Sequence, residues 1–225
     1  MKHRVQKLIS NAGYCSRRKA ETLIEEGKVK VNGKRITIGD KALATDRIVV
    51  EGRELKFPRK EYILFCKPWG MITSLSDPKM DNTVGKFIEK NFKERLIPVG
   101  RLDKHTEGLL ILTNDGDFAN KIMHPRYEVK KTYYVSVSKP IKPEHIKSLE
   151  KGIEIEGKKT YPAKVKTITA NEIEITIHEG RNRIVRKMME TFGYTVKQLI
   201  RIKIGDLYIG SLKPRKWRRL SSKEV

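Results

Sequence analysis

Residues 100–116, GRLDKHTEGLLILTNDG, place a carboxylate, Asp103, on a loop just before an apolar run. The run LLILT at 109–113 predicts a buried strand, and a loop that enters a buried strand holds its side chains in fixed positions. A carboxylate held in this way can act as a nucleophile or as a base. Aspartate is also common in turns and caps, where its side chain hydrogen-bonds the backbone. The local sequence leaves Asp103 open between these two roles.

Two further segments remain as candidates for a site, KKTYYV at 130–135 and EGRNRIVRK at 179–187. The motifs of several other enzyme classes are missing, since the chain has no Walker lysine loop, no GxGxxG before a helix, no HExxH and no GxSxG. The five histidines lack metal-ligand spacing. Asp115 and Asp117 share a turn that begins a helix, which explains both. We therefore expect no metal site.

Charge is the strongest feature of the composition. The 225 residues include 49 Lys and Arg against 27 Asp and Glu, a formal net charge of +22. Such an excess indicates a polyanionic partner, because Lys and Arg release counterions when they neutralise phosphates. A thermophile-like surface is the alternative, but it would raise Glu together with Lys. We expect a nucleic acid partner, and charge alone does not distinguish DNA from RNA.

Several classes of protein are disfavoured by the same sequence. No apolar run of 18 residues is present, so we expect no membrane-spanning helix. The first residues, MKHRVQKLISNAGYC, are charged and do not have the pattern of a signal peptide. Cys15 and Cys66 lie far apart and indicate neither a disulfide framework nor a zinc site. We expect a reducing, cytoplasmic setting.

The N-terminal quarter of the chain predicts two helices followed by short strands. A first short helix ends at Gly13, and Ser16 is placed to cap a second helix that ends before Gly27. Asn32-Gly33 predicts the type I′ turn of a hairpin. Residues 46–52 predict one more short strand.

Six basic residues of this quarter are candidates for phosphate binding. They begin the second helix or lie on the hairpin: Arg17, Arg18, Lys19, Lys28, Lys30 and Lys34. Basic side chains at a helix N-terminus oppose the macrodipole, so a phosphate ligand would explain their placement. A plain solvated basic face is the alternative. The run AGYCSRRKAETLIEEGKVKVNGKRI at 12–36 resembles the S4 RNA-binding domain, which implies docking onto structured RNA through the basic helix and hairpin.

The rest of the chain interleaves strands and helices without a regular βαβ period. Residues 52–61 read as a charged linker, so we expect an S4 domain at 1–57 and a second domain at 58–225. The second domain predicts a strand at KKTYYVSVS, a hairpin that turns near Ala170 and Asn171, and an amphipathic helix RIVRKMMETFGY. The last segment reads as two short strands. We expect an α+β fold with a mixed, mainly antiparallel sheet flanked by helices.

Five stretches in this order resemble pseudouridine synthases of the group named for RsuA, RluB, RluE and RluF. They are KPWG at 67–70, GRLDKHTEGLLILTNDGD at 100–117, MHPRYEVKKTYYV at 123–135, EGRNRIVRKM at 179–188 and LIRIKIGDLYIGSLKP at 199–214. An S4 domain ahead of such a core is typical of the group. Arg215 departs from the pattern, because a glycine often stands there.

The resemblance implies roles for particular residues. Asp103 matches the essential aspartate, Tyr133 the tyrosine of the K-x-Y motif, and Arg186 the arginine that partners the aspartate. It implies no cofactor, because isomerisation of uridine imports no group and oxidises nothing. Further candidates for RNA contact flank these positions: Arg101, Lys104, Lys131, Arg181, Asn182 and Arg183. Lys104 is equally compatible with a surface role, and Lys131 with an edge-strand charge.

We expect a monomeric rRNA pseudouridine synthase, with 23S rRNA favoured as the substrate and 16S rRNA as the alternative. A non-catalytic S4-type RNA-binding or ribosome-assembly factor is the competing class. The presence of all three catalytic positions favours the enzyme.

Overall fold

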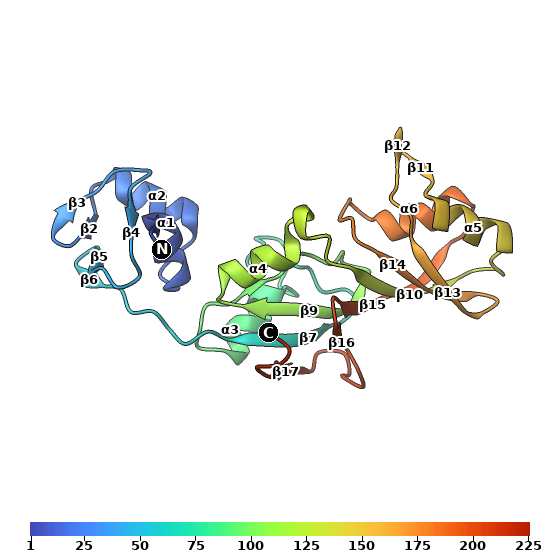
Figure 1. Ribbon diagram of the computed structural model, residues 1–225. Helices are drawn as coiled ribbons and strands as arrows, with labels where there is room; N and C mark the ends of the chain where they lie inside the picture. The colour runs from blue at the N-terminus through green and yellow to red at the C-terminus, as the bar shows by residue number, and fades with distance from the viewer.

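The computed structural model describes residues 1–225. The molecule is elongated: the N-terminal helices and strands lie at one end, a part built around β7 and β9 lies in the middle, and α5 and α6 lie at the other end (Figure 1). The order of elements along the chain therefore follows the long axis only in part, because β15 returns from the far end to the middle.

Two short helices and a small sheet form the N-terminal unit. Helix α1 spans Val5–Asn11 and α2 spans Arg17–Glu25. Ser16 caps α2 as expected, since its side chain accepts a hydrogen bond from the backbone N–H of Lys19 at 3.2 Å. The strands pair in the order β3-β2-β5-β6, and β1 pairs with β4. Their bounds are β1 His3–Arg4, β2 Val29–Val31, β3 Lys34–Arg35, β4 Lys41–Ala42, β5 Ile48–Val50 and β6 Arg53–Glu54.

The predicted type I′ hairpin is confirmed. Asn32 and Gly33 have φ angles of 50° and 83°, which are the positive values that this turn requires. The unit has its own apolar core, in which Leu8 and Ile9 of α1 and Leu23 and Ile24 of α2 pack together with buried residues of the small strands.

A few polar contacts join the N-terminal unit to the rest of the chain. Lys7 pairs with Asp117 at 2.6 Å, and Arg95 donates a hydrogen bond to the carbonyl of Cys15 at 3.1 Å. Exposed ion pairs of this kind contribute little stability. The two parts are also joined by the irregular segment between β6 and β7 (Figure 1).

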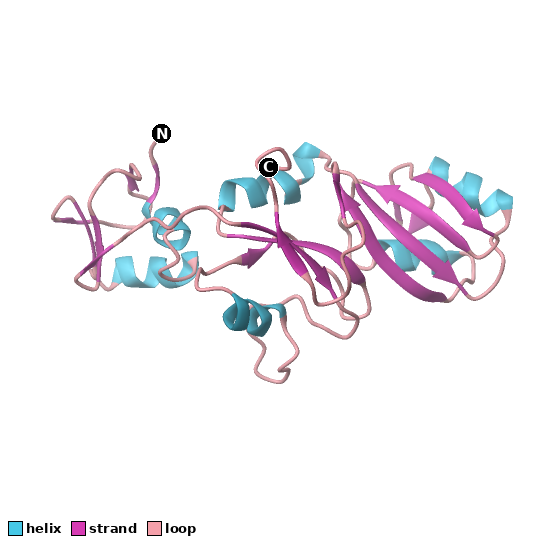
Figure 2. Ribbon diagram, turned by 90° about the horizontal axis from the view of Figure 1, so that it is seen from below, coloured by secondary structure: helices cyan, strands magenta, loops and turns pink.

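One mixed sheet runs through the remainder of the molecule (Figure 2). Its strand order is β13-β14-β10-β15-β9-β7-β17, and the short strands β8 and β16 pair with β9 and β15. All neighbours are antiparallel except β15 and β9. The predicted α+β class is therefore confirmed. The bounds are β7 Tyr62–Lys67, β8 Ile97–Pro98, β9 Glu107–Thr113, β10 Lys131–Val137, β13 Lys164–Thr169, β14 Glu172–Ile177, β15 Val196–Ile204, β16 Leu207–Tyr208 and β17 Trp217–Arg219.

Helices cover both faces of the sheet. Helix α3, Val84–Asn91, and α4, Gly116–Met123, belong to opposite faces of the β7–β9 region, whereas α5, Pro143–Lys151, and α6, Ile184–Thr191, share one core with β10 and β14. A 3-10 turn at Pro125–Tyr127 follows α4, and a small hairpin, β11 Glu154–Ile155 with β12 Lys158–Lys159, projects beside α6.

Strand β9 explains why LLILT has no polar alternation. Leu110 and Leu112 belong to the core beneath α3, whereas Leu109 and Ile111 belong to the core beneath α4. All four side chains are fully buried. A strand covered on both faces reads as a continuous apolar run. The loop that carries Asp103 therefore leads into a strand that is buried on both faces.

The prediction of two short strands at the C-terminus is wrong. The segment contains the nine-residue β15 and the two short strands β16 and β17. The start of β15, Val196–Gln198, is polar and largely exposed, so it gives no strand signal by itself. Pairing with β10 on one side extends it, and β9 pairs with its middle on the other. No helix of the structure is long and apolar enough to cross a membrane.

Candidate active site

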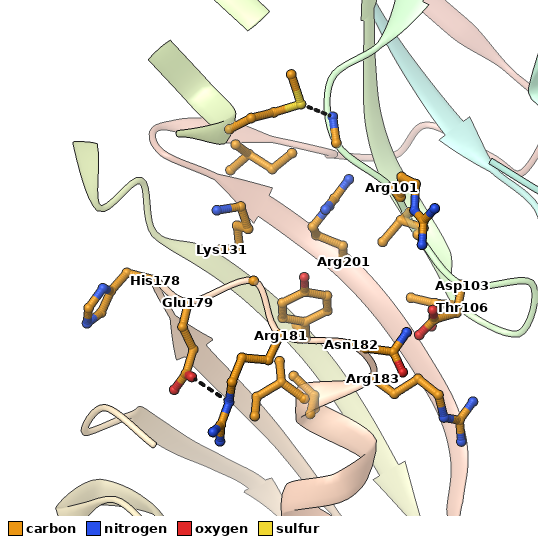
Figure 3. Close-up of a pocket in the computed structure, with 18 of the residues that line it drawn as sticks. Arg101, Asp103, Thr106, Lys131, His178, Glu179, Arg181, Asn182, Arg183 and Arg201 are labelled. Carbon is orange, nitrogen blue, oxygen red and sulfur yellow. Dashed lines mark hydrogen bonds and ion pairs between the residues drawn. The ribbon is translucent and has the colours of Figure 1, made fainter. Parts of the chain in front are cut away.

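A cleft with a cavity of about 650 Å³ lies where β10 and β15 meet the Asp103 loop (Figure 3). Its lining comes from six places in the chain: the loop 99–106, the end of α4 with the turn that follows it, the start of β10, the segment 158–161, the segment 178–185 and the strand β15. The cleft brings together seven of the candidate residues: Arg101, Asp103, Lys131, Tyr133, Arg181, Asn182 and Arg183.

Asp103 lies at one side of the cleft and is partly exposed. Its backbone carbonyl accepts a hydrogen bond from the N–H of Thr106 at 3.0 Å, which closes a turn. Its carboxylate forms no hydrogen bond and no ion pair, unlike that of Asp115, which caps α4. The turn is therefore made by the backbone, and the carboxylate is free to face a ligand.

The backbone around Asp103 is held by one local donor and by four donors from two distant segments, residues 67–73 and Arg186. Every carbonyl from Leu102 to Thr106 accepts a hydrogen bond. The donors are, in chain order of the acceptor, Thr73 Oγ1 at 2.7 Å, Thr106 N at 3.0 Å, Gly70 N at 2.8 Å, Arg186 Nη2 at 2.5 Å and Lys67 Nζ at 2.7 Å. Such anchoring fixes the direction of the carboxylate before any ligand binds.

Arg186 lies behind this loop and does not line the cleft. Only 8% of its surface is exposed, and its guanidinium donates to the carbonyl of His105. Burial and then the charge of Arg183 lower the pKa of Arg186, and the charge of Asp103 opposes them. The expected direct pair between Arg186 and Asp103 is not formed. Arg186 is linked to the aspartate through the backbone of the loop, at His105, and through the electrostatic interaction of the two charges.

Strands β10 and β15 supply the floor of the cleft. Lys131 and Tyr133 are two residues apart on β10 and so share one face, and Arg201 lies opposite Tyr133 on β15. Because β10 pairs on both sides with β14 and β15, Lys131 is not an edge-strand charge, and that alternative is wrong. Burial lowers the pKa of the Lys131 ammonium, and the charge of Arg201 lowers it further.

Arg201 is a buried cation without a carboxylate partner. It is 3% exposed, and its Nε donates to the carbonyl of Leu109 at 2.8 Å. Its Nη2 is buried and has no hydrogen-bond partner. A buried donor without a partner is costly and rare, and the positive charge of Arg201 lies at the lining of the cleft.

The segment 179–183 forms a wall of the cleft. Arg181 pairs with Glu179 at 3.1 Å and also donates to the carbonyl of Lys158 at 3.1 Å. Asn182 and Arg183 are exposed. Arg183 has a φ of 53°, in the left-handed region, at the residue that caps α6. The backbone thus turns sharply here, and these polar side chains border the cleft (Figure 3).

The other candidates lie outside the cleft. Lys104 is exposed and is not part of the lining. Arg17 lines a groove between the N-terminal unit and α4, while Lys28 pairs with Glu26 at 2.8 Å. The other four candidates for phosphate binding in the N-terminal unit are exposed: Arg18, Lys19, Lys30 and Lys34.

Three residues of the site escaped the sequence reasoning: Lys67, Thr73 and Arg201. Lys67 and Arg201 stand within the stretches KPWG and LIRIKIGDLYIGSLKP, so the motifs already contained them. A lysine directly after the buried run YILFC was the available signal. Nothing in the local sequence of Thr73 distinguishes it from an ordinary loop residue.

Known proteins identify this architecture. Residues 61–191 match the family described as RNA pseudouridylate synthase, and residues 3–48 match the S4 domain. The first match covers more than half of the chain, which therefore belongs to the RNA pseudouridylate synthase family, the enzymes that isomerise uridine to pseudouridine. Both resemblances noted in the sequence are confirmed.

Individual relatives agree with the family. The chain is 46% identical to "Ribosomal large subunit pseudouridine synthase B" of Bacillus subtilis (strain 168), over 99% of this chain and 93% of the relative. It is 40% identical to "Dual-specificity RNA pseudouridine synthase RluF" of Escherichia coli (strain K12), over 99% of this chain and 77% of the relative. A solved "Crystal structure of pseudouridylate synthase" has a TM-score of 0.71 at 30% identity and covers 98% of this chain and 97% of that one.

Proposed function

We propose that this enzyme isomerises a specific uridine of ribosomal RNA, in the 23S rRNA of the large subunit, and that Asp103 is its essential catalytic group. The observation that carries the proposal is the free Asp103 carboxylate on a fully anchored loop at the side of a basic cleft. The name of the relative from Bacillus subtilis, which refers to the large ribosomal subunit, supports 23S over 16S rRNA.

The reaction breaks the N1–C1′ bond of uridine, turns the base and joins C5 to C1′. The target base must leave its stack to reach the cleft. Tyr133 and Asp103 both line the cleft. In this proposal Tyr133 would stack on the uracil, and Asp103 would act at the ribose, either on C1′ or on the 2′ proton. Arg186 donates a hydrogen bond to the His105 carbonyl and would keep the Asp103 loop in position while the base rotates.

Two groups of basic side chains would bind different parts of the RNA. Arg101, Lys131, Asn182 and Arg183 line the cleft and would contact the target strand. Five exposed cations of the N-terminal unit form no ion pair, in contrast to Lys28, and would bind a structured part of the RNA: Arg17, Arg18, Lys19, Lys30 and Lys34. We place the domain boundary after residue 57, so that 1–57 docks the RNA and 58–225 modifies it. We expect a monomer that works in the cytoplasm.

Mapping of pseudouridine in ribosomal RNA, after treatment with the protein in vitro, tests this function. Wild-type protein should create one new site in 23S rRNA, and Asp103→Asn should create none while it binds the same RNA with unchanged affinity. Asp206→Asn, an exposed aspartate on the turn after β15, is the matched control and should keep full activity. If Asp103→Asn modifies RNA at the normal rate, the assignment is wrong. If wild-type protein binds RNA and modifies none, a non-catalytic role replaces the enzyme.

A further inference from the structure

The cleft extends well beyond the residues that the isomerisation uses. At its side away from Asp103 lie two aromatic rings, Tyr161 and His178, whose centroids are 4.5 Å apart. His178 and Asp103 lie at opposite sides of the opening, with Lys131 and Arg201 between them in this view (Figure 3). The cavity of about 650 Å³ is larger than one pyrimidine nucleotide needs.

Tyr161 is exposed, and its backbone is anchored. The residue has 57% of its surface accessible to solvent, although the burial of an aromatic ring is favourable. Its backbone N–H donates to Glu179 at 2.9 Å, and Glu179 also binds Arg181 at 3.1 Å. Arg181 in turn holds the carbonyl of Lys158, so the hairpin strand before Tyr161 is anchored as well. A solvent-facing ring on an anchored backbone, beside a second aromatic ring, is a suitable platform for a nucleic acid base.

The cations between the two sides lack acidic partners. Lys131 donates only to the carbonyl of Val129, at 2.9 Å, and Arg201 keeps one buried nitrogen unpaired. Neither of them forms a salt bridge, whereas the nearby Arg181 does. The burial of two neighbouring positive charges is unfavourable unless an anion joins them. A phosphodiester that links a nucleotide on the Asp103 side to one on the Tyr161 side would be that anion.

We propose that the side of the cleft at Tyr161 and His178 is a second nucleotide subsite, which takes an unstacked base next to the target uridine, while Lys131 and Arg201 bind the phosphate between the two nucleotides. The proposal rests on the proposed function, since it assigns the neighbour of the uridine that Asp103 acts on. The enzyme then opens two adjacent nucleotides of its RNA, and the identity of the second contributes to the choice of substrate.

Equilibrium binding tests the subsite without any turnover. The probe is the ribosomal RNA fragment that the protein protects from nuclease digestion, made intact and with the base deleted at one position at a time. Tyr161→Ala should raise the dissociation constant of the intact RNA about tenfold, as expected for one lost base stack. Tyr161→Phe should keep wild-type affinity. Tyr208→Ala, an equally exposed tyrosine outside the cleft, should change nothing.

The base deletions make the result specific. Wild-type protein and Tyr161→Ala should bind equally well to the one RNA that lacks the base beside the target uridine, and should differ on all others. The same loss on every RNA, or no loss on the intact RNA, overturns the subsite. Lys131→Met should reduce the slope of log K against log salt by about 0.7, the value for one phosphate of a single strand. An unchanged slope, as expected for the exposed control Lys147→Met on α5, overturns the phosphate contact. Because these readouts are binding constants, they stand even if Asp103→Asn were to refute the proposed chemistry.

Discussion

Lys67 is the only lysine among the buried residues, and its burial has a measurable consequence for stability. Its side chain is 0% exposed and donates to the carbonyls of Thr106 at 2.7 Å and Pro68 at 3.1 Å. Burial lowers the pKa of Lys67 from 10.5 to about 8, although the charges of Glu107 and Asp103 oppose the shift. Lys67→Met keeps most of the volume and removes the titrating group.

The sign of the effect follows from proton binding. Between the folded pKa of about 8 and the unfolded value of 10.5, the unfolded chain binds a proton that the folded protein has released, so stability rises with pH. A shift of about 2.5 pKa units, at 1.36 kcal/mol per unit, corresponds to about 3 kcal/mol in total. Most of it, about 2–3 kcal/mol, should appear between pH 7 and pH 10.

Urea unfolding at pH 7, 8, 9 and 10 measures this contribution. The fluorescence of Trp69 and Trp217 reports on the catalytic part of the chain. The free energy of unfolding of wild type minus that of Lys67→Met should grow by about 2–3 kcal/mol across this range. Burial also raises the pKa of Cys66, to about 11, which has the opposite sign, but Cys66 is present in both proteins and largely cancels. If this difference in the free energy of unfolding does not change with pH, the lowered pKa of the buried Lys67 ammonium is refuted.

Three further predictions test other parts of the molecule. The double change Lys30→Glu and Lys34→Glu should weaken RNA binding and reduce the slope of log K against log salt by about 0.7–0.9 for each lost phosphate contact. RNA titrations at several salt concentrations measure this slope, and an unchanged slope would mean that the phosphate contacts lie elsewhere. Arg215 has a φ of 66°, which glycine adopts without strain, so Arg215→Gly should raise the free energy of unfolding by about 1 kcal/mol in a urea titration. Equal stability of the two proteins would contradict backbone strain at Arg215. Thr73→Val removes the hydroxyl that bonds both the N–H and the C=O of Leu102, so it should cost about 1–3 kcal/mol of stability and slow single-turnover isomerisation. An unchanged rate would show that this anchor of the loop is not needed for catalysis.

The sequence predicted much of the fold, because local signals and tertiary structure agree in most elements. Ser16 caps α2, Asn32-Gly33 forms the hairpin turn, and LLILT becomes a strand covered on both faces. Capping and turn geometry depend on neighbours in the chain, so residue types are sufficient to predict them. The long β15 was missed because its polar start is stabilised by pairing with β10, a partner that lies about sixty residues earlier in the sequence.

The sequence by itself determined the family and the basic charge, and its motifs singled out Asp103 as the candidate aspartate, since motifs and composition are properties of residue order. Only the tertiary structure decided which charges act together. It placed Arg186 behind the loop at the carbonyl of His105, and it left Arg201 buried beside Lys131 without an acid. Ion pairing and burial depend on distances between segments that fold together from far apart, and no spacing along the chain encodes those distances.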